Sequence, residues 1–206
     1  MKMKKTYFIG IIFFCMFSFH AKSQSSVGAK VDMNLSNFAV KTTHLKSSIN
    51  VGGSAGLFYK YTRHNRAIET DVMFRYLTSK FKNLDTGETA DYRYIGIALP
   101  VYFLMQADID NQSLYLGMGP FASYGMSGYY KSNNQRIDLY SENPINGKAK
   151  MRRWDFGAGF ITGYELKCRL QFNLNFQIGF RNMIKNGFES DELMSVLLGL
   201  GVGYRF

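Results

Sequence analysis

Few side chains of this sequence could act as a nucleophile, a general base or a metal ligand. The chain has three histidines, of which His44 lies close to Ser47 and Ser48. A serine–histidine pair can hydrolyse an ester when an acidic group orients the histidine. The segment around His44 contains no acidic residue, so we interpret His44 as a polar loop residue. We predict no catalytic residue, no metal site and no cofactor, with lipid hydrolysis as the least favoured alternative.

A second candidate for chemistry is a basic segment, residues 129–153, whose cations outnumber its acidic residues Asp138 and Glu142. Lysine and arginine bind phosphate groups through charge-assisted hydrogen bonds. The segment is therefore either a binding site for lipopolysaccharide phosphates or a solvated basic loop, and both interpretations stay open. Its cations are Lys131, Arg136, Lys148, Lys150, Arg152 and Arg153.

The elements that must position these residues are β-strands. In residues 170–180, LQFNLNFQIGF, an apolar residue alternates with a polar residue or glycine at every step. A period of two is typical of a strand with two unlike faces. For the fourth strand the pattern does not decide which face points inward, because both of its faces are largely apolar. The predicted strands are residues 27–36, 51–61, 68–76, 94–103, 114–128, 153–165, 170–180 and 194–206.

The length of these strands and the spacing between them favour a membrane barrel. Soluble strands average about 5–6 residues, whereas a strand that crosses a bilayer needs about 9–11. Longer connectors, residues 38–48, 80–88, 129–150 and 184–192, alternate with short turns. Outer-membrane barrels have short periplasmic turns and longer external loops. We therefore predict an all-β fold, an eight-stranded antiparallel up-and-down transmembrane β-barrel.

The polar face of the strands is expected to line the lumen. It is rich in Gly, Asn, Gln and Ser, and small residues suit the narrow interior of an eight-stranded barrel. Charges in a lumen have to pair, so we predict an ionic network there, which also includes Lys60 and Glu165. The candidate members are Lys30, Asp32, Glu69, Asp71, Arg75, Arg93, Arg153, Asp155, Arg181 and Arg205.

The first residues predict export. A basic start, a 13-residue apolar run from Tyr7 to Phe19 and the small-x-small triplet Ala21–Ser23 are typical of a cleavable signal peptide, residues 1–23. The barrel domain would then be residues 24–206, and removal of four signal lysines lowers the formal net charge from +10 to +6. Much of the basic excess therefore serves export, and we predict no nucleic-acid partner.

The C-terminus predicts an assembly signal. Gly201, Tyr204 and Phe206 fit the pattern that the barrel-assembly machinery reads, although Leu200 stands where a polar residue is preferred. Aromatic residues also gather toward the strand ends, as at water–lipid boundaries. Those at the short-turn end are Tyr59, Tyr61, Tyr164, Tyr204 and Phe206, and those near the long loops are Tyr92, Tyr129 and Trp154.

Several motifs resemble the PorT-like outer-membrane β-barrel family of Bacteroidota. They are GAKVDMNLSNF (residues 28–38), YIGIALPVYF (94–103), LYLGMGPFASYGMSG (114–128), DFGAGFITGYEL (155–166) and LGLGVGYRF (198–206). The resemblance covers nearly all of residues 26–206, and it implies the barrel architecture rather than an activity. One member of that family is linked to protein secretion across the outer membrane.

These features together predict a non-enzymatic integral outer-membrane scaffold, exported through its signal peptide. Its external loops would contact the surroundings or lipopolysaccharide, and its other contacts would be outer-membrane lipid and the assembly machinery. An envelope protein partner is possible under the alternative interpretation, in which the chain is an accessory component of a secretion or transport assembly.

Overall fold

The computed structural model describes residues 25–40, 45–48, 50–83, 89–110, 112–132, 135–140, 151–183 and 193–206. The expected signal peptide, residues 1–23, lies outside these residues, as does His44. In the described part of the chain, no helix is long and apolar enough to cross a membrane.

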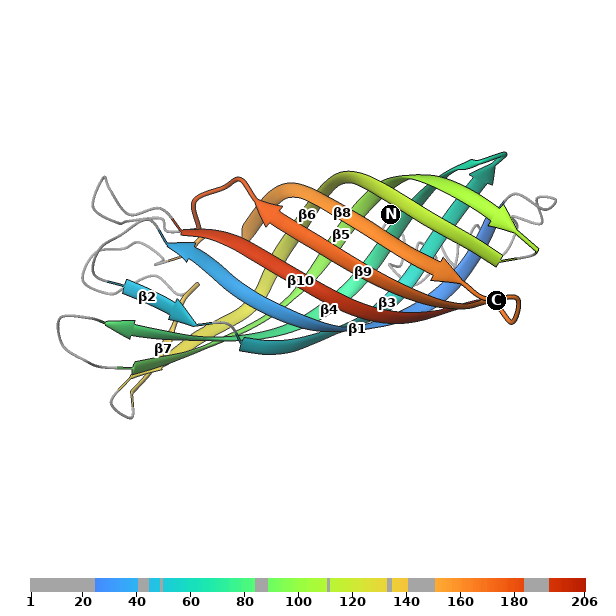
Figure 1. Ribbon diagram of the computed structural model, residues 1–206. Helices are drawn as coiled ribbons and strands as arrows, with labels where there is room; N and C mark the ends of the chain where they lie inside the picture. Colours follow the sequence, from blue (N-terminus) through green and yellow to red (C-terminus); the bar gives the residue numbers. More distant parts are fainter. Residues whose placement is uncertain are drawn as a thin grey trace, which may run out of the picture.

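The described residues form ten strands (Figure 1). Eight of them are long and correspond to the eight predicted strands, while β2 and β7 have four residues each. The strands are β1 (Ser25–Val40), β2 (Leu45–Ser48), β3 (Asn50–Arg63), β4 (Arg66–Asn83), β5 (Thr89–Ile109), β6 (Gln112–Ser132), β7 (Gln135–Asp138), β8 (Trp154–Glu165), β9 (Leu170–Gly179) and β10 (Leu193–Arg205).

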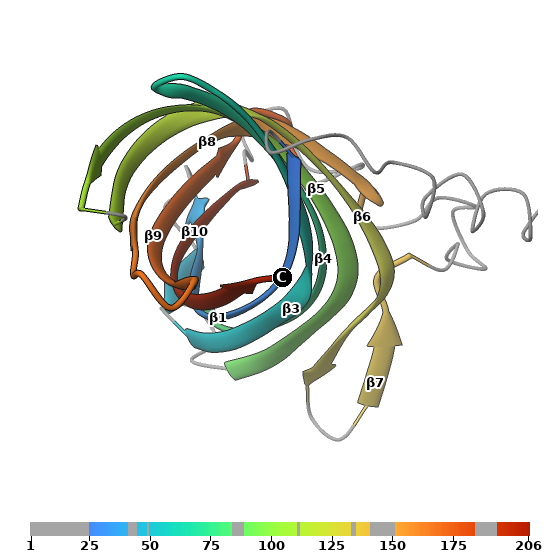
Figure 2. The same ribbon diagram turned by 90° about the vertical axis from the view of Figure 1, so that its right-hand side faces the viewer.

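The eight long strands close into an antiparallel barrel, as predicted. Each pairs with its neighbours in the order β1, β3, β4, β5, β6, β8, β9, β10, and β10 pairs back to β1. In the closing pair Val31 lies opposite Val202 and Gly28 lies opposite Arg205. The view along the axis shows the resulting ring (Figure 2). Closure leaves the ring without an unpaired edge strand.

The short strands β2 and β7 extend the barrel wall. β2 pairs with residues 80–83 of β4, beyond the last pair of β4 with β3. β7 pairs with residues 129–132 of β6, beyond the last pair of β6 with β8. The prediction that residues 38–48 and 129–150 are entirely loop is therefore wrong. The long strands β4 and β6 would otherwise present unpaired backbone groups there.

Three tight turns lie at one end of the barrel, which we call the turn end; the opposite end is the loop end. Each turn contains a residue with a positive φ angle: His64 (56°), Asp110 (49°) and Arg169 (67°). The left-handed conformation lets the chain reverse within a few residues. Ser25 of β1 and Phe206 also lie at the turn end, which confirms the predicted alternation of short and long connectors.

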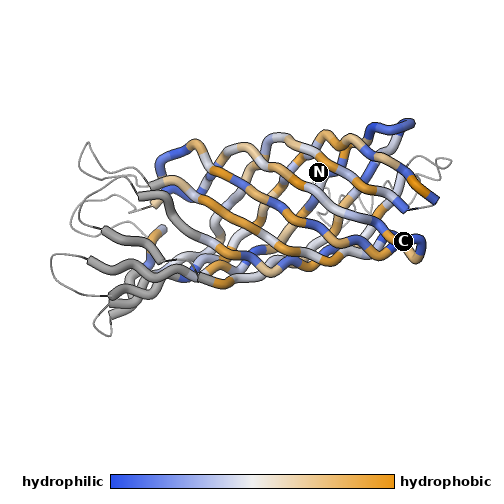
Figure 3. Tube along the Cα trace, in the orientation of Figure 1, coloured by the Kyte–Doolittle hydropathy of each residue, from blue (hydrophilic) through white to orange (hydrophobic). Residues whose placement is uncertain are grey.

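The two faces of the strands are inverted relative to a soluble protein. In β9 the side chains of Gln171, Asn173, Asn175 and Gln177 are at most 5% exposed, whereas Phe172 and Phe176 are more than 40% exposed. Figure 3 shows the same alternation of hydrophilic and hydrophobic residues along the barrel. The structure also settles the orientation of the fourth predicted strand, which is β5. Its side chains at every second position from Tyr94 to Tyr102 point inward.

Candidate functional site

The centre of the lumen holds a buried ionic cluster. Lys30 of β1 donates hydrogen bonds to Glu69 at 2.7 Å and to Asp71 at 3.0 Å, both on β4. All three side chains are buried, and the ammonium lies 5.2 Å from the centroid of the Phe58 ring. A buried ammonium is stabilised only by such partners. The cluster therefore fixes β1 relative to β4 across the intervening strand β3.

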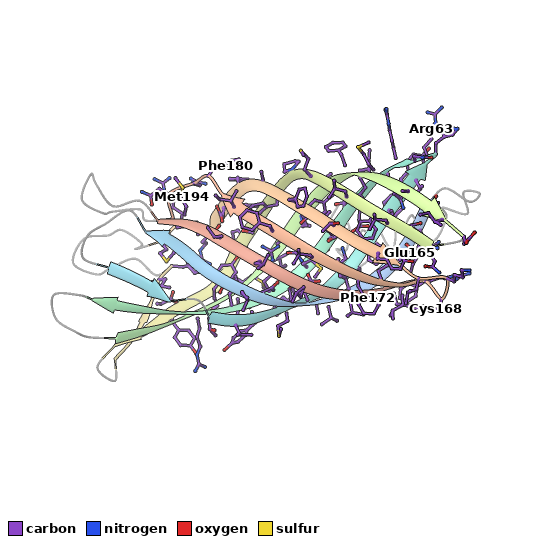
Figure 4. The ribbon with its side chains drawn as sticks, in the orientation of Figure 1. Arg63, Glu165, Cys168, Phe172, Phe180 and Met194 are labelled. Carbon is purple, nitrogen blue, oxygen red and sulfur yellow. The ribbon has the colours of Figure 1, made fainter. Side chains whose placement is uncertain are left out.

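A second ionic cluster closes the lumen toward the turn end, and Glu165 of β8 is its centre (Figure 4). Its carboxylate lies 2.6 Å from the guanidinium of Arg205 and 3.9 Å from the ammonium of Lys60. The side-chain amide of Gln171 donates a hydrogen bond to the same carboxylate at 2.8 Å. Since these residues come from β3, β8, β9 and β10, the cluster connects four strands at one level of the barrel.

Arg75 of β4 reaches across the lumen to β9. It donates to the side-chain oxygen of Gln177 at 2.7 Å, and Gln177 donates to the hydroxyl of Tyr102 on β5 at 2.8 Å. Further polar contacts lie on either side, where Ser54 donates to Asp32 at 3.3 Å and Ser195 donates to Asp155. These hydrogen bonds join opposite walls, so the lumen is crossed by side chains.

Large side chains fill much of the remaining interior. Tyr102, Tyr115, Phe58, Met73 and Ile161 are at most 2% exposed. The sequence prediction stressed small and polar lumen residues and missed this packing, although all five occupy inward positions of the alternation. Among the residues that the structure describes, a cavity of about 50 Å³ is lined by residues such as Arg75, and one of about 190 Å³ at the turn end is lined by residues such as Lys60.

Gly201, from the predicted assembly signal, has a role inside the barrel. It lies opposite Asp32 on one neighbouring strand and Asn173 on the other. A Cβ placed on Gly201 would lie 1.8 Å from Oδ1 of Asp32. The missing side chain thus makes room for two polar side chains in the lumen. The other two residues of the signal, Tyr204 and Phe206, point outward at the turn end with ring centroids 5.9 Å apart.

Of the arginines expected in the lumen network, Arg93 points outward, and Arg153 and Arg181 lie at the loop end. Arg93 is opposite Tyr129 in the β5–β6 pair, and its guanidinium lies 5.9 Å from that ring. Because the adjacent Tyr94 points inward, Arg93 points outward. Arg153 precedes β8 and is exposed at the loop end, and Arg181 follows β9. The lumen prediction is therefore wrong for Arg93, whereas Arg153 and Arg181 lie at the loop-end mouth of the barrel.

Arg152, Arg153 and Arg181 come together instead at the loop end, where β8 begins and β9 ends. The backbone of Arg152 bonds to Met183 at 2.9 Å, and Phe180 bonds to Phe156 at 2.8 Å. The Arg153 guanidinium donates to the carbonyls of Gly125 and Met126 at 3.2 and 3.1 Å. It also lies 4.7 Å from the ring of Tyr140. These contacts hold a cation at the outer rim of the wall.

Outward aromatic side chains lie at the same level of the wall as these arginines. Trp154 stacks on Phe156 with centroids 5.8 Å apart and lies 4.9 Å from Tyr124. The Arg181 guanidinium lies 6.0 Å from the Phe156 ring. We call the whole group the rim patch: Arg152, Arg153, Arg181, Tyr124, Trp154 and Phe156. Exposed aromatic rings next to cations are typical of a water–lipid boundary.

The other predicted binding residues are placed less fully. Lys131 lies opposite Arg136 in the β6–β7 pair, so the backbone brings these two positions together. Lys148 and Lys150 lie outside the described residues. His64 lies in the β3–β4 turn, and within the described ranges no group of His, Cys, Asp and Glu could hold a metal ion.

A closed antiparallel barrel with an apolar outer face and a polar, ion-paired interior defines an integral membrane β-barrel. The family model described as "Outer membrane protein beta-barrel domain" matches residues 18–185. The chain belongs to this family, and it is a protein of the outer membrane. No curated protein matches the sequence.

Solved structures of similar fold include other small outer-membrane barrels. Neisserial surface protein A is 12% identical, with 89% of this chain and 100% of that chain covered and a TM-score of 0.47. OprG from Pseudomonas aeruginosa is 14% identical, with coverages of 90% and 97% and a TM-score of 0.48. Ail from Yersinia pestis is 12% identical, with coverages of 89% and 100% and a TM-score of 0.45. These likenesses support no inference about ligands or activity.

Proposed function

We propose that the protein is a non-enzymatic outer-membrane scaffold whose loop end binds the phosphate groups of lipopolysaccharide. The observation that carries this proposal is the rim patch, in which the backbone bond from Arg152 to Met183 brings the positions of Arg152, Arg153 and Arg181 to one level of the wall, with Arg181 6.0 Å from the outward ring of Phe156. A guanidinium presents a planar fork of donors that matches phosphate oxygens. Several such groups at one level can bind a phosphorylated lipid headgroup while the rings contact its apolar part.

The filled lumen supports a scaffold role over an open pore. Eight strands leave only side-chain room inside a barrel, and here that room is occupied by Tyr102, Tyr115 and the cluster around Lys30. The same side chains connect opposite walls and make the wall rigid. Binding residues commonly lie on the loops and ends of a rigid framework.

Orientation and export belong to the proposal as well. Short turns face the periplasm in barrels of this kind, so the turn end with His64, Asp110 and Arg169 would be periplasmic and the rim patch external. Export would depend on cleavage after residue 23. N-terminal sequencing of the protein purified from outer membranes should therefore begin at Gln24.

The motifs that resemble PorT-like barrels support a second candidate, an accessory component of a secretion or transport assembly. In that case, chemical cross-linking in cells followed by purification should recover defined envelope proteins with the barrel. Under the scaffold proposal, the barrel should be recovered with lipopolysaccharide alone.

Binding of lipopolysaccharide tests the proposal directly. The refolded barrel is incubated in detergent with lipid A or with lipid A lacking phosphates, and retained lipid is measured by native mass spectrometry. Arg152→Gln/Arg153→Gln/Arg181→Gln should lose retention of lipid A, while Lys167→Gln/Arg169→Gln, in the β8–β9 turn at the other end, should keep it. Arg181→Gln alone, which leaves the Arg153 contacts intact, should weaken retention. Equal retention of lipid A by all variants would contradict the proposal. Equal retention by the wild type of lipid A with and without phosphates would contradict it as well.

A further inference from the structure

A groove on the outer surface lies at the turn end, opposite the rim patch. It has a volume of about 430 Å³ and is formed by the ends of β3, β4 and β5. Arg63 lies at the tip of the β3–β4 hairpin and projects away from the barrel (Figure 4). The groove is lined by Tyr61, Arg63, Arg66, Ala67, Ile68, Phe103, Leu104 and Met105.

The strand register arranges the outward residues of the groove in two rows. In the row nearest the turn, Arg63 lies opposite Arg66, and Arg66 lies opposite Met105. In the next row, Tyr61 lies opposite Ile68, and Ile68 lies opposite Phe103. The groove thus has a cationic margin toward the turn and an apolar floor toward the middle of the barrel.

The two arginines form an unfavourable pair without an additional ligand. Directly opposed residues of antiparallel strands have Cβ atoms about 4.5–5.5 Å apart, and like charges at such positions repel. Among the residues that the structure describes, neither Arg63 nor Arg66 takes part in a salt bridge. An anion between the two guanidinium groups would turn this repulsion into attraction on both sides.

The rest of the groove fits an acyl chain. Ile68, Phe103 and Met105 are 44%, 58% and 71% exposed and point away from the lumen. Tyr61, at 40% exposed, lies in the same row as Ile68 and Phe103, one row away from the arginines, and its hydroxyl-bearing ring suits a water–lipid boundary. The two rows, cationic toward the turn and apolar toward the middle of the barrel, match the order of phosphate and acyl chain in a phospholipid.

We propose that this groove binds one anionic phospholipid of the inner leaflet, with its phosphate between Arg63 and Arg66 and an acyl chain along Ile68 and Phe103. The site lies at the opposite end of the barrel from the rim patch and goes beyond the lipopolysaccharide function. It would anchor the β3–β4 hairpin to the periplasmic leaflet.

Native mass spectrometry of the refolded barrel tests this site. The barrel is incubated with phosphatidylglycerol or with phosphatidylcholine, and the retained lipids are counted. The wild type should retain one phosphatidylglycerol in preference to phosphatidylcholine. Arg63→Gln/Arg66→Gln should weaken that retention on the order of tenfold, because each arginine near an anionic lipid surface contributes to binding. Lys167→Gln/Arg169→Gln, at the same end but away from the groove, should leave it unchanged.

A single substitution, followed by urea unfolding, distinguishes loss of the lipid site from misfolding of the double variant. Arg66→Gln removes the like-charge pair, so in phosphatidylcholine vesicles it should unfold at a higher urea concentration than the wild type. In phosphatidylglycerol vesicles this advantage should disappear. Three outcomes would overturn the proposal: equal retention by the wild type and the groove variant, equal loss in the groove and control variants, or a dimer that the groove variant abolishes, which would assign the groove to a second copy of the chain.

Discussion

The ammonium of Lys30 lies 2.7 Å from a carboxylate oxygen of Glu69, although β3 separates their strands in the barrel wall. Asp71 supplies the second contact at 3.0 Å. The barrel is thus held together by backbone pairs around its circumference and by ionic contacts through its interior. The second kind of contact makes specific stability predictions.

Replacement of Lys30 by methionine should destabilise the barrel strongly. It leaves the buried carboxylates of Glu69 and Asp71 without their cation, and loss of one partner from a buried ion pair costs about 3–5 kcal/mol. Urea unfolding in phospholipid vesicles measures the change. The triple variant Lys30→Met/Glu69→Gln/Asp71→Asn, which removes all three charges, should recover most of the loss. If Lys30→Met unfolds at the wild-type urea concentration, the cluster does not stabilise the barrel.

Gly201→Ala should destabilise the barrel because the new Cβ would lie 1.8 Å from Oδ1 of Asp32. Overpacking of this kind costs about 1–3 kcal/mol. Gly203→Ala is the matched control on the same strand, since a Cβ there would come no closer than 3.2 Å to its nearest neighbour, the Ala29 carbonyl oxygen. Combination with Asp32→Ala should relieve the defect of Gly201→Ala. Equal unfolding curves for the two glycine variants would refute this explanation.

Phe206→Ala should reduce the amount of folded barrel in the outer membrane, because Phe206 completes the predicted assembly signal. Its backbone N–H bonds to Val27 at 2.9 Å and would still do so after substitution. Phe180→Ala is the control, since Phe180 and Phe206 are similarly exposed, at 66% and 64%. Immunoblots of membrane fractions measure the outcome. A similar reduction in both variants would show that loss of an exposed ring, rather than the signal, is responsible.

The intact barrel should migrate faster on a denaturing gel when unheated than when boiled. Its closed ring of hydrogen-bonded strands and its buried ion pairs resist detergent until heat opens them. Extraction should require detergent, because residues such as Phe172 and Leu200 present apolar side chains outward. A chain that remains in solution without detergent and shows one gel mobility would contradict the membrane barrel.

The period-two pattern is sufficient to predict the eight long strands and, for all but the fourth, the face that the strand presents to lipid. It works because one register error would move every side chain of a strand to the wrong face. Arg93 was misplaced because charge was weighed above position, although the neighbouring Tyr94 occupies an inward position. β2 and β7 have four residues each, which is too short for a periodic signal, and the partner of β2, residues 80–83 of β4, is also distant in the sequence.

The sequence does not predict which side chains of the candidate sites contact one another. That Lys30, Glu69 and Asp71 belong to one network followed from their inward positions, but which cation meets which carboxylate depends on strand stagger. The meeting of Arg152 and Arg153 with Arg181 likewise depends on where β8 begins and β9 ends. The basic composition of residues 129–153 indicates Arg152 and Arg153 as loop cations, although Arg153 is also expected in the lumen network, and Arg181 is expected only there.

The backbone bond between Leu139 and Met151 has a practical consequence. The N–H of Met151 bonds to the Leu139 carbonyl at 3.0 Å, while Leu139 bonds to Gly128 and Arg153 bonds to Gly125. These bonds hold Leu139 and Met151 next to each other beside the end of β6. A change in the number of residues between Tyr140 and Met151 should leave these bonds intact, because loop length adds little to the cost of closure. A foreign epitope inserted between Tyr140 and Met151 should therefore be carried at the loop end by an unchanged barrel.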